Sequence, residues 1–260
     1  MRTLWRNRRL MRSMVRRDIL ARYRGSFAGA AWTFLNPLLL MATYFFVFGV
    51  VLQTRFGADQ SRSGFILYFL AGMLPWLAFA EAVGRSPHVI LEHRNFVKKL
   101  VFPLETLPAN LVISGAVTEL FALGIFVAGL LIARGTLPAT ALWLPVLVIP
   151  QLLFTAGLCW FLAALGVFMR DLTQIIGFLL NLVFFLTPIL YPDTALPEAA
   201  RKVLGINPVY ILVRGYRAIF LENQAPAIVP VATLWVVSLL LAAGGYLWFR
   251  RLRKGFADVI

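Results

Sequence analysis

The sequence predicts an all-α integral membrane protein with six transmembrane helices. It also predicts an N-terminal amphipathic interfacial helix, and short re-entrant helices between spans 5 and 6. Three observations lead to this fold class. Hydrophobic residues make up 60% of the 260 residues, and the mean hydropathy is +0.81. Several apolar runs reach about 20 residues, the length that crosses a hydrocarbon core of roughly 30 Å. Lysines and arginines gather at the ends of these runs, where membrane topology places them.

Residues 1–24 are predicted to form the interfacial helix. At 100° per residue, one face collects the apolar side chains of Leu4, Met11, Met14, Val15 and Ile19. Most arginines of the segment lie on the other side, so the helix should rest on an anionic membrane surface. The alternative is a cluster of positive charges that only sets topology.

A single transmembrane domain is expected to occupy residues 1–260. Charge stops after Arg24 and resumes at Arg55, which predicts the first span. A tight turn at Arg170 and Asp171 separates the fourth span from the fifth, and these two residues are expected to pair or to cap helix ends. The six predicted spans are residues 32–53, 65–83, 108–132, 142–168, 172–190 and 228–249.

The longest connection between spans, residues 191–227, is not simply polar. Its apolar stretch 209–213 is too short to cross a bilayer, and Arg214 and Arg217 follow it. This pattern predicts short helices that enter the membrane edge and return, which is permitted where protein or water satisfies the backbone.

An even number of spans places both termini on the same side. With that side cytoplasmic, 18 of the 25 lysines and arginines are internal and 7 are external. The positive-inside rule therefore predicts that the N- and C-termini are cytoplasmic.

The chemical inventory argues against an enzyme. There is no GxxxxGK[ST] phosphate loop, and no Ser–His–acid or paired-carboxylate arrangement is evident, so no catalytic residue is assigned. The only histidines, His88 and His93, have no Cys or acidic cluster beside them, so no metal site is expected. Cys159 is the lone cysteine. The net charge of +14 sits at span ends rather than in a basic domain, which argues against nucleic-acid binding.

Glu119 is the costliest residue to bury, because it lies in the middle of the third predicted span. Asn181, in the middle of the fifth span, is the candidate hydrogen-bond partner. A structural hydrogen bond is favoured over the alternative, an ion or proton site, because no second buried charge accompanies Glu119.

Four segments together resemble a known family. They are RYRGSFAGAAWTFLNPLL (22–39), FVKKLVFPLETLP (96–108), MRDLTQIIGFLLNLVFFLTPILYP (169–192) and NPVYILVRGYR (207–217). In this order they resemble the membrane (permease) subunits of type-2 ABC polysaccharide exporters. The O-antigen exporter (Wzm) group and its teichoic-acid relatives are the most similar, and capsule exporter permeases differ more in the first span.

The resemblance implies a homodimer docked on two copies of a cytoplasmic ABC ATPase, which binds ATP and Mg while this chain holds no cofactor. The expected substrate is a glycan on an undecaprenyl-diphosphate-type lipid carrier, exported across the bacterial inner membrane. By the same resemblance, the ATPase-coupling element falls on Asn95, Phe96, Val97, Lys98 and Lys99. The alternative for this stretch is a loop kept inside by its charges.

Two further sets of residues are candidates for substrate contact. Arg22 and Arg24, at headgroup depth, could bind the carrier diphosphate through bidentate hydrogen bonds, or could serve topology alone. Aromatic rings could line the glycan path, because they offer rigid faces to sugars, although rings at helical spacing usually pack against other helices. The candidate path residues are Phe34, Tyr44, Phe45 and Phe48 in the first span, and Phe178 and Phe185 in the fifth.

Two other functions remain open. One is a type-2 ABC permease for capsule, teichoic acid, drugs or small lipids. The other is a membrane-embedded transferase acting on lipid-linked sugars, which would need acidic or histidine residues near a membrane face. The external candidates Asp59, Asp193, Glu198 and Glu222 are scattered, so this function is disfavoured.

Overall fold

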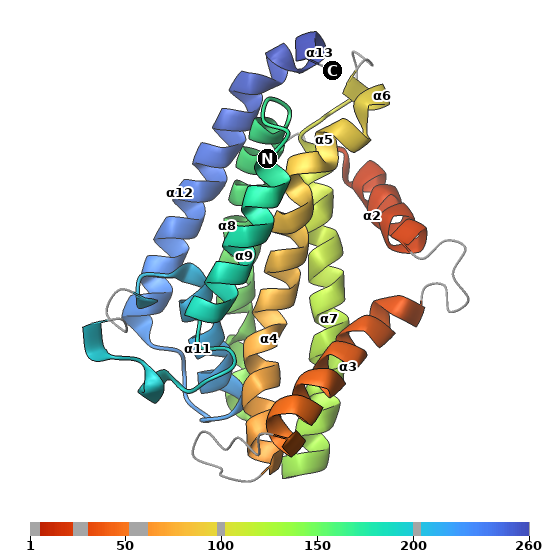
Figure 1. Ribbon diagram of the computed structural model, residues 1–260. Helices are drawn as coiled ribbons and strands as arrows, with labels where there is room; N and C mark the ends of the chain where they lie inside the picture. The colour runs from red at the N-terminus through yellow and green to blue at the C-terminus, as the bar shows by residue number, and fades with distance from the viewer. Residues whose placement is uncertain (1–5, 23–30, 52–61, 98–101, 200–203, 260) are drawn as a thin grey trace.

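The structure is a computed structural model that describes residues 6–22, 31–51, 62–97, 102–199 and 204–259. Within these ranges every regular element is a helix, which confirms the all-α prediction (Figure 1). The longer helices are α2 (Arg8–Arg22), α3 (Trp32–Tyr44), α4 (Arg62–Arg85), α7 (Thr106–Arg134), α8 (Leu144–Gly166), α9 (Leu172–Leu186), α11 (Pro208–Phe220) and α12 (Ile228–Leu252). The shorter elements are η2 (Phe45–Val51), η3 (Ser86–His88), α5 (Val89–Glu92), α6 (Arg94–Val97), η4 (Ala139–Trp143), η5 (Asp193–Ala195), η6 (Arg253–Gly255) and α13 (Phe256–Val259).

In the described ranges, four helical stretches are long and apolar enough to cross a membrane, so the chain is a multi-pass membrane protein. They are Gly64–Glu92, Thr106–Arg134, Ala139–Gly166 and Ile228–Gly255. The first and fifth predicted spans correspond to shorter apolar helices, within Leu38–Phe48 and Leu172–Leu186. The prediction that helix continues to residue 190 is wrong, since α9 ends at Leu186. Thr187 takes an extended conformation, as a residue before proline usually does.

The four long helices run side by side, and α9 lies along the same bundle (Figure 1). α12 packs on α8, and α4 packs on α7. α3 crosses obliquely over one end of the bundle and contacts α7. α2 lies against α7 at the opposite end.

Glycine sets the distance between α8 and α12. A Cβ atom at Gly157 would overlap the backbone of Leu241, and one at Gly245 would overlap the carbonyl of Gly157. Close backbone approach through small residues is a common way to pack helices in lipid, where no hydrophobic force draws them together.

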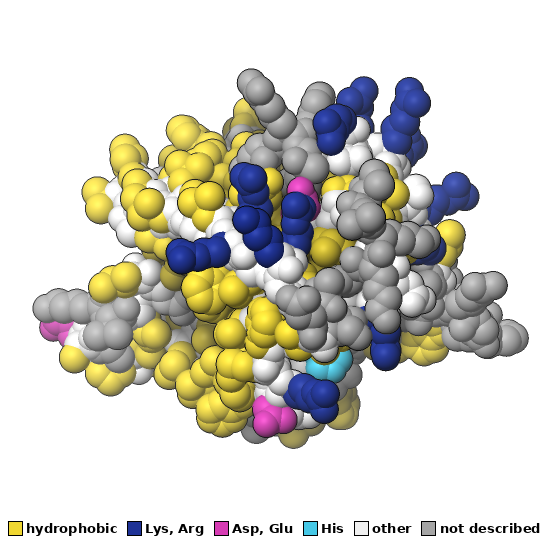
Figure 2. Space-filling model, turned by 90° about the horizontal axis from the view of Figure 1, so that it is seen from above, with side chains coloured by type: hydrophobic (Ala, Val, Ile, Leu, Met, Phe, Trp, Pro, Cys, Tyr) yellow, Lys and Arg dark blue, Asp and Glu magenta, His cyan; other side chains and the backbone are white. Residues whose placement is uncertain are grey.

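Positive side chains gather at one end of the bundle. That end carries α2, α5, α6, the turn between α8 and α9, and α13, and it is uppermost in Figure 1. Figure 2 looks onto it and shows lysine and arginine side chains spread across the surface. The segments predicted to share one side of the membrane are thus found at one end of the molecule.

Candidate functional site

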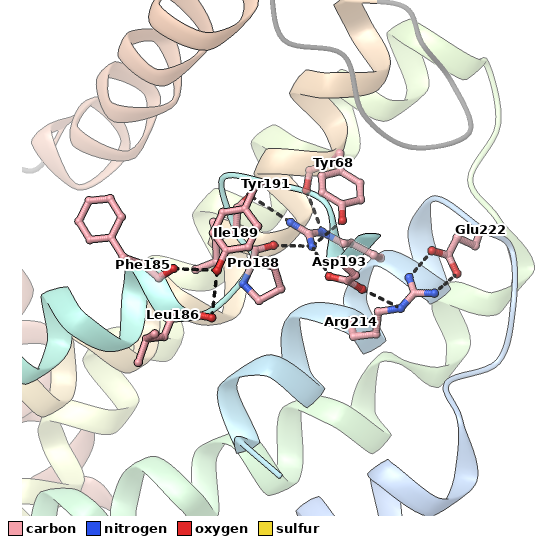
Figure 3. A network of polar contacts seen from close by, with 10 residues as sticks. Tyr68, Phe185, Leu186, Pro188, Ile189, Tyr191, Asp193, Arg214 and Glu222 are labelled. Carbon is pink, nitrogen blue, oxygen red and sulfur yellow. Dashed lines mark hydrogen bonds and ion pairs between the residues drawn. The ribbon is translucent and has the colours of Figure 1, made fainter. Parts of the chain in front are cut away.

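The main polar site in the described chain is built around Arg217 of α11, whose side chain is fully buried. Its Nε donates to the carbonyl of Tyr68 (3.2 Å) and Nη1 donates to the hydroxyl of the same residue (2.9 Å). Nη1 and Nη2 also donate to the carbonyls of Pro188 (2.7 Å) and Ile189 (3.0 Å). Figure 3 shows Tyr68, Pro188, Ile189 and Asp193 converging on this point.

Burying a guanidinium is costly unless its donors are paired, and these acceptors supply the pairing. The Tyr68 ring adds a cation–π contact, with the guanidinium carbon 3.5 Å from the ring centroid. Burial lowers the pKa of Arg217, and the neighbouring Tyr68 and Asp193 oppose that shift. Arginine still stays charged, because its ordinary pKa is so high. The site thus joins the last turn of α11 to α4 and to the backbone just after α9.

A second, half-exposed arginine extends the network outward. Arg214 Nε lies 3.3 Å from Asp193 Oδ2, and its two Nη atoms bind the carboxylate of Glu222. Arg217 Nη1 lies 3.7 Å from the other oxygen of Asp193. Asp193 therefore interacts with both arginines, and ties η5 to α11.

The end of α9 is fixed by further hydrogen bonds. The hydroxyl of Tyr191 donates to the carbonyls of Phe185 (2.8 Å) and Leu186 (3.2 Å), which a helix end leaves unpaired. Asn207 caps α11 by accepting from the backbone N–H of Val209, and its amide donates to Thr187 Oγ1. The connection 191–227 is thus a structured assembly that holds the end of α9.

Glu119 takes part in a separate buried network, which includes Tyr216, the residue before Arg217 in the chain. Gln151 Nε2 donates to Glu119 Oε2 (2.7 Å), and the hydroxyl of Tyr216 donates to Glu119 Oε1 (2.6 Å). The prediction of Asn181 as partner is wrong. Asn181 is exposed and donates to the carbonyl of Gly177 in its own helix, because α9 turns that side away from α7.

Three of the five coupling candidates, Asn95, Phe96 and Val97, lie on α6, at the positively charged end. Asn95 is exposed, and the half-buried ring of Phe96 stacks on Phe102 with centroids 4.4 Å apart. The guanidinium carbon of Arg17 of α2 lies 6.0 Å from the Phe96 ring centroid. Val97 ends α6, but its side chain is not described, and Lys98 and Lys99 lie outside the described residues.

The diphosphate candidates fall largely outside the described chain. Arg22 ends α2, without a described side chain, and Arg24 lies beyond the described residues. Arg170 and Asp171 were expected to pair or to cap helix ends, and the Asp171 side chain makes no capping hydrogen bond at the start of α9.

The four aromatic path candidates with described side chains divide into two groups. Tyr44 and Phe48 are half-buried and pack on α4, with Tyr44 4.9 Å from Phe69 and Phe48 6.3 Å from Phe65 between ring centroids. Both rings therefore contact α4 and stay partly exposed. The rings of Phe178 and Phe185 on α9 are 68% and 62% exposed. The side chains of Phe34 and Phe45 are not described.

Sequence reasoning missed the assembly around Arg217, which depends on contacts between distant segments. One signal was available in the sequence. The apolar stretch 209–213 is followed by Arg214 and, after Gly215 and Tyr216, by a second arginine, Arg217. A charge on the apolar face of a short helix requires a dedicated partner.

For metals, the described residues contain no group of three or more His, Cys, Asp or Glu side chains that could hold an ion.

Comparison with known proteins places these features in a family. The family model for the ABC-2 type transporter matches residues 9–221. The chain is 38% identical, over 100% of its length and 98% of the relative's, to an O-antigen export system permease protein RfbA of Myxococcus xanthus. A protein of the same name from Klebsiella pneumoniae is 27% identical, over 94% of this chain and 92% of its own length.

A more distant relative is the inner membrane transport permease YadH of Escherichia coli K12. It is 28% identical over 78% of this chain and 82% of its own length. The family match covers most of the chain, including α4, α7, α8, α9 and the Arg217 site. The chain therefore belongs to the ABC-2 type transporter family.

Proposed function

We propose that this chain is the permease subunit of an ATP-driven exporter of O-antigen-type polysaccharide, carried on an undecaprenyl-diphosphate-type lipid across the bacterial inner membrane. The observation that carries this proposal is the 38% identity, from end to end, with a relative named as an O-antigen export permease. The match to YadH, whose name gives no substrate, is weaker and covers less of the chain.

The proposed complex is a homodimer bound to two copies of a cytoplasmic ABC ATPase, which would bind ATP and Mg. Each chain is one transmembrane domain with six spans, in which α3 with η2 forms the first span and α9 the fifth. The cationic end that carries α2, α6 and α13 faces the cytoplasm, in accord with the positive-inside rule. On this orientation α11 lies toward the periplasm. Its 13 residues extend only about 20 Å, which suits a re-entrant helix.

In this proposal, α6 and the following lysines dock on the ATPase. The position of α6 at the cationic end supports this, as does the exposure of Asn95 beside the stacked Phe96. Lys98 and Lys99 would pair with acidic groups of the ATPase. ATP-driven movement of that subunit would reach the bundle through α5, α6 and the Phe96–Phe102 contact.

The glycan path is proposed to follow the exposed face of α9, where Phe178 and Phe185 present open rings. Tyr44 and Phe48 of the first span, with Phe34 and Phe45, would complete the aromatic lining from the neighbouring helix. Arg22 and Arg24 would hold the carrier diphosphate where the interfacial helix meets the first span.

Deletion of the gene tests the proposed substrate. In the mutant, polysaccharide should disappear from the cell surface, while the lipid-linked polymer accumulates on the cytoplasmic face of the inner membrane. A plasmid copy of the gene should restore export. Normal surface polysaccharide in the deletion strain would contradict the proposal, and a change in drug tolerance alone would favour another type-2 ABC permease.

A further inference from the structure

Helix α2, which corresponds to the predicted interfacial helix, forms one wall of a groove against α7. This groove has a volume of about 740 Å³ and is open on one side. Its size lies in the range of small-molecule sites. Its lining residues are Arg8, Met11, Arg12, Val15, Arg16, Ile19, Leu20 and Ile113.

Two parallel rows of side chains on α2 give the groove its chemistry. Met11, Val15 and Ile19 recur every four residues and form an apolar floor, together with Ile113 of α7. Arg8, Arg12 and Arg16 repeat at the same interval beside them and form a cationic rim. Among the described residues that line the groove, none is acidic.

The rotation of α2 about its axis is fixed, so the two rows have a defined direction. Asp18 accepts two hydrogen bonds from Arg85 of α4, at 2.7 and 3.1 Å, and Met11 and Met14 are buried in the core. Arg12 and Arg16 are exposed, and neither has an ion pair or hydrogen bond with any other residue in the described ranges.

We propose that this groove binds an anionic phospholipid from the surrounding bilayer. The acyl chain would lie on the apolar floor, and the phosphate would accept hydrogen bonds from Arg12 and Arg16, since guanidinium groups bind phosphate oxygens in a bidentate manner. The bound lipid would hold α2 against α7 at headgroup depth. This binding does not depend on which substrate the transporter exports.

Native mass spectrometry of the full-length permease with its ATPase subunit tests the site. The complex is purified in detergent with equal amounts of dioleoyl phosphatidylglycerol and dioleoyl phosphatidylcholine, which differ only in headgroup. The wild-type chain should retain phosphatidylglycerol preferentially. The double variant Arg12→Gln/Arg16→Gln should lose roughly tenfold or more of that preference, because each basic residue near an anionic headgroup contributes substantially.

The matched control is Arg6→Gln/Arg9→Gln, which removes the same charge from the same segment at residues that do not line the groove. It should keep the preference within about twofold. Equal losses in both double variants would mean that only general charge attracts the lipid, and would overturn the proposal.

A second variant tests the groove without altering charge. Ile113→Trp places a larger side chain on the floor and should abolish the retained phosphatidylglycerol while the complex still assembles. Unchanged retention in this variant would contradict a site in the groove. Displacement of phosphatidylglycerol by an equimolar polyisoprenyl phosphate, sensitive to the Arg12→Gln/Arg16→Gln change, would assign the groove to the carrier lipid and likewise overturn the proposal.

Discussion

At Arg217, one buried side chain connects three separate parts of the chain. Its guanidinium donates to Tyr68 of α4 and to the backbone carbonyls of Pro188 and Ile189 beyond α9. Removing it would leave buried acceptors unpaired, which is more costly than losing an exposed ion pair. The residue thus positions the end of α9, the helix that carries Phe178 and Phe185.

We expect Arg217→Lys to lower stability by about 2 kcal/mol or more, because an ammonium cannot reach all these acceptors at once. For a chain of this size, that is a fall in melting temperature of roughly 4–8 °C. Thermal unfolding of the purified permease measures it. Arg214→Lys, at the half-exposed neighbour, should change stability by less than about 1 kcal/mol. Equal melting temperatures for Arg217→Lys and the wild type would refute this role.

Residue-level prediction from the sequence succeeded in part for Glu119. The cost of burying its carboxylate indicated a hydrogen-bonded partner, and the structure supplies two, Gln151 and Tyr216. The choice of Asn181 failed because depth in a predicted span says nothing about the direction in which a helix presents that residue. Tyr216 was not identified because it lies within the connection 191–227, in a segment without a transmembrane signal.

Among the helices, the close contact of α8 with α12 depends on Gly157 and Gly245. We expect Gly157→Ala to destabilise the protein by about 1–3 kcal/mol, because the added Cβ overlaps the Leu241 backbone and forces the helices apart. Thermal unfolding again provides the measurement. The control Gly124→Ala places its Cβ in open space on α7 and should be neutral or slightly stabilising. If both variants unfold alike, close packing at Gly157 is unimportant.

The coupling element gives a second prediction for a helix. The variant Phe96→Ala/Lys99→Ala should reduce recovery of the ATPase with the tagged permease by roughly tenfold or more, since an anchoring ring and a charge are lost together. Phe102→Leu removes the stacking partner of Phe96 and leaves residues 95–99 unchanged, so it should reduce recovery less. Wild-type recovery and export from the double variant would exclude docking through α6.

Long apolar runs predicted α4, α7, α8 and α12 to within a few residues, because the hydrocarbon thickness fixes their length. The same rule failed for α9, where Thr187 and Pro188 end the helix before the apolar run ends. Helix pairing could not be predicted, because the exposed and packed faces of an apolar helix have similar compositions. The stacking of Tyr44 and Phe48 on α4 illustrates this limit.

For the whole molecule, the clustering of α2, α6 and α13 at one end leads to a topology prediction. A membrane-impermeant thiol reagent applied to intact cells should label a cysteine at Thr194, which is exposed in η5, within the connection 191–227 that is proposed to lie outside. Cysteines at Arg94 and Lys254 should react only after the membrane is opened. The native Cys159 is fully buried and should give little background. Labelling of Arg94→Cys from outside would reverse the proposed orientation.

In the proposed function, this chain and a partner ATPase move lipid-linked polysaccharide across a membrane. The most direct measurement uses proteoliposomes that hold both subunits with their ATPase facing outward, and lipid-linked glycan in the outer leaflet. After ATP addition, the fraction of glycan protected from an external glycosidase is measured against time. We predict that protection rises with ATP and stays at background with an ATPase variant that cannot hydrolyse it. ATP hydrolysis by the assembled complex without any gain in protected glycan would contradict the account.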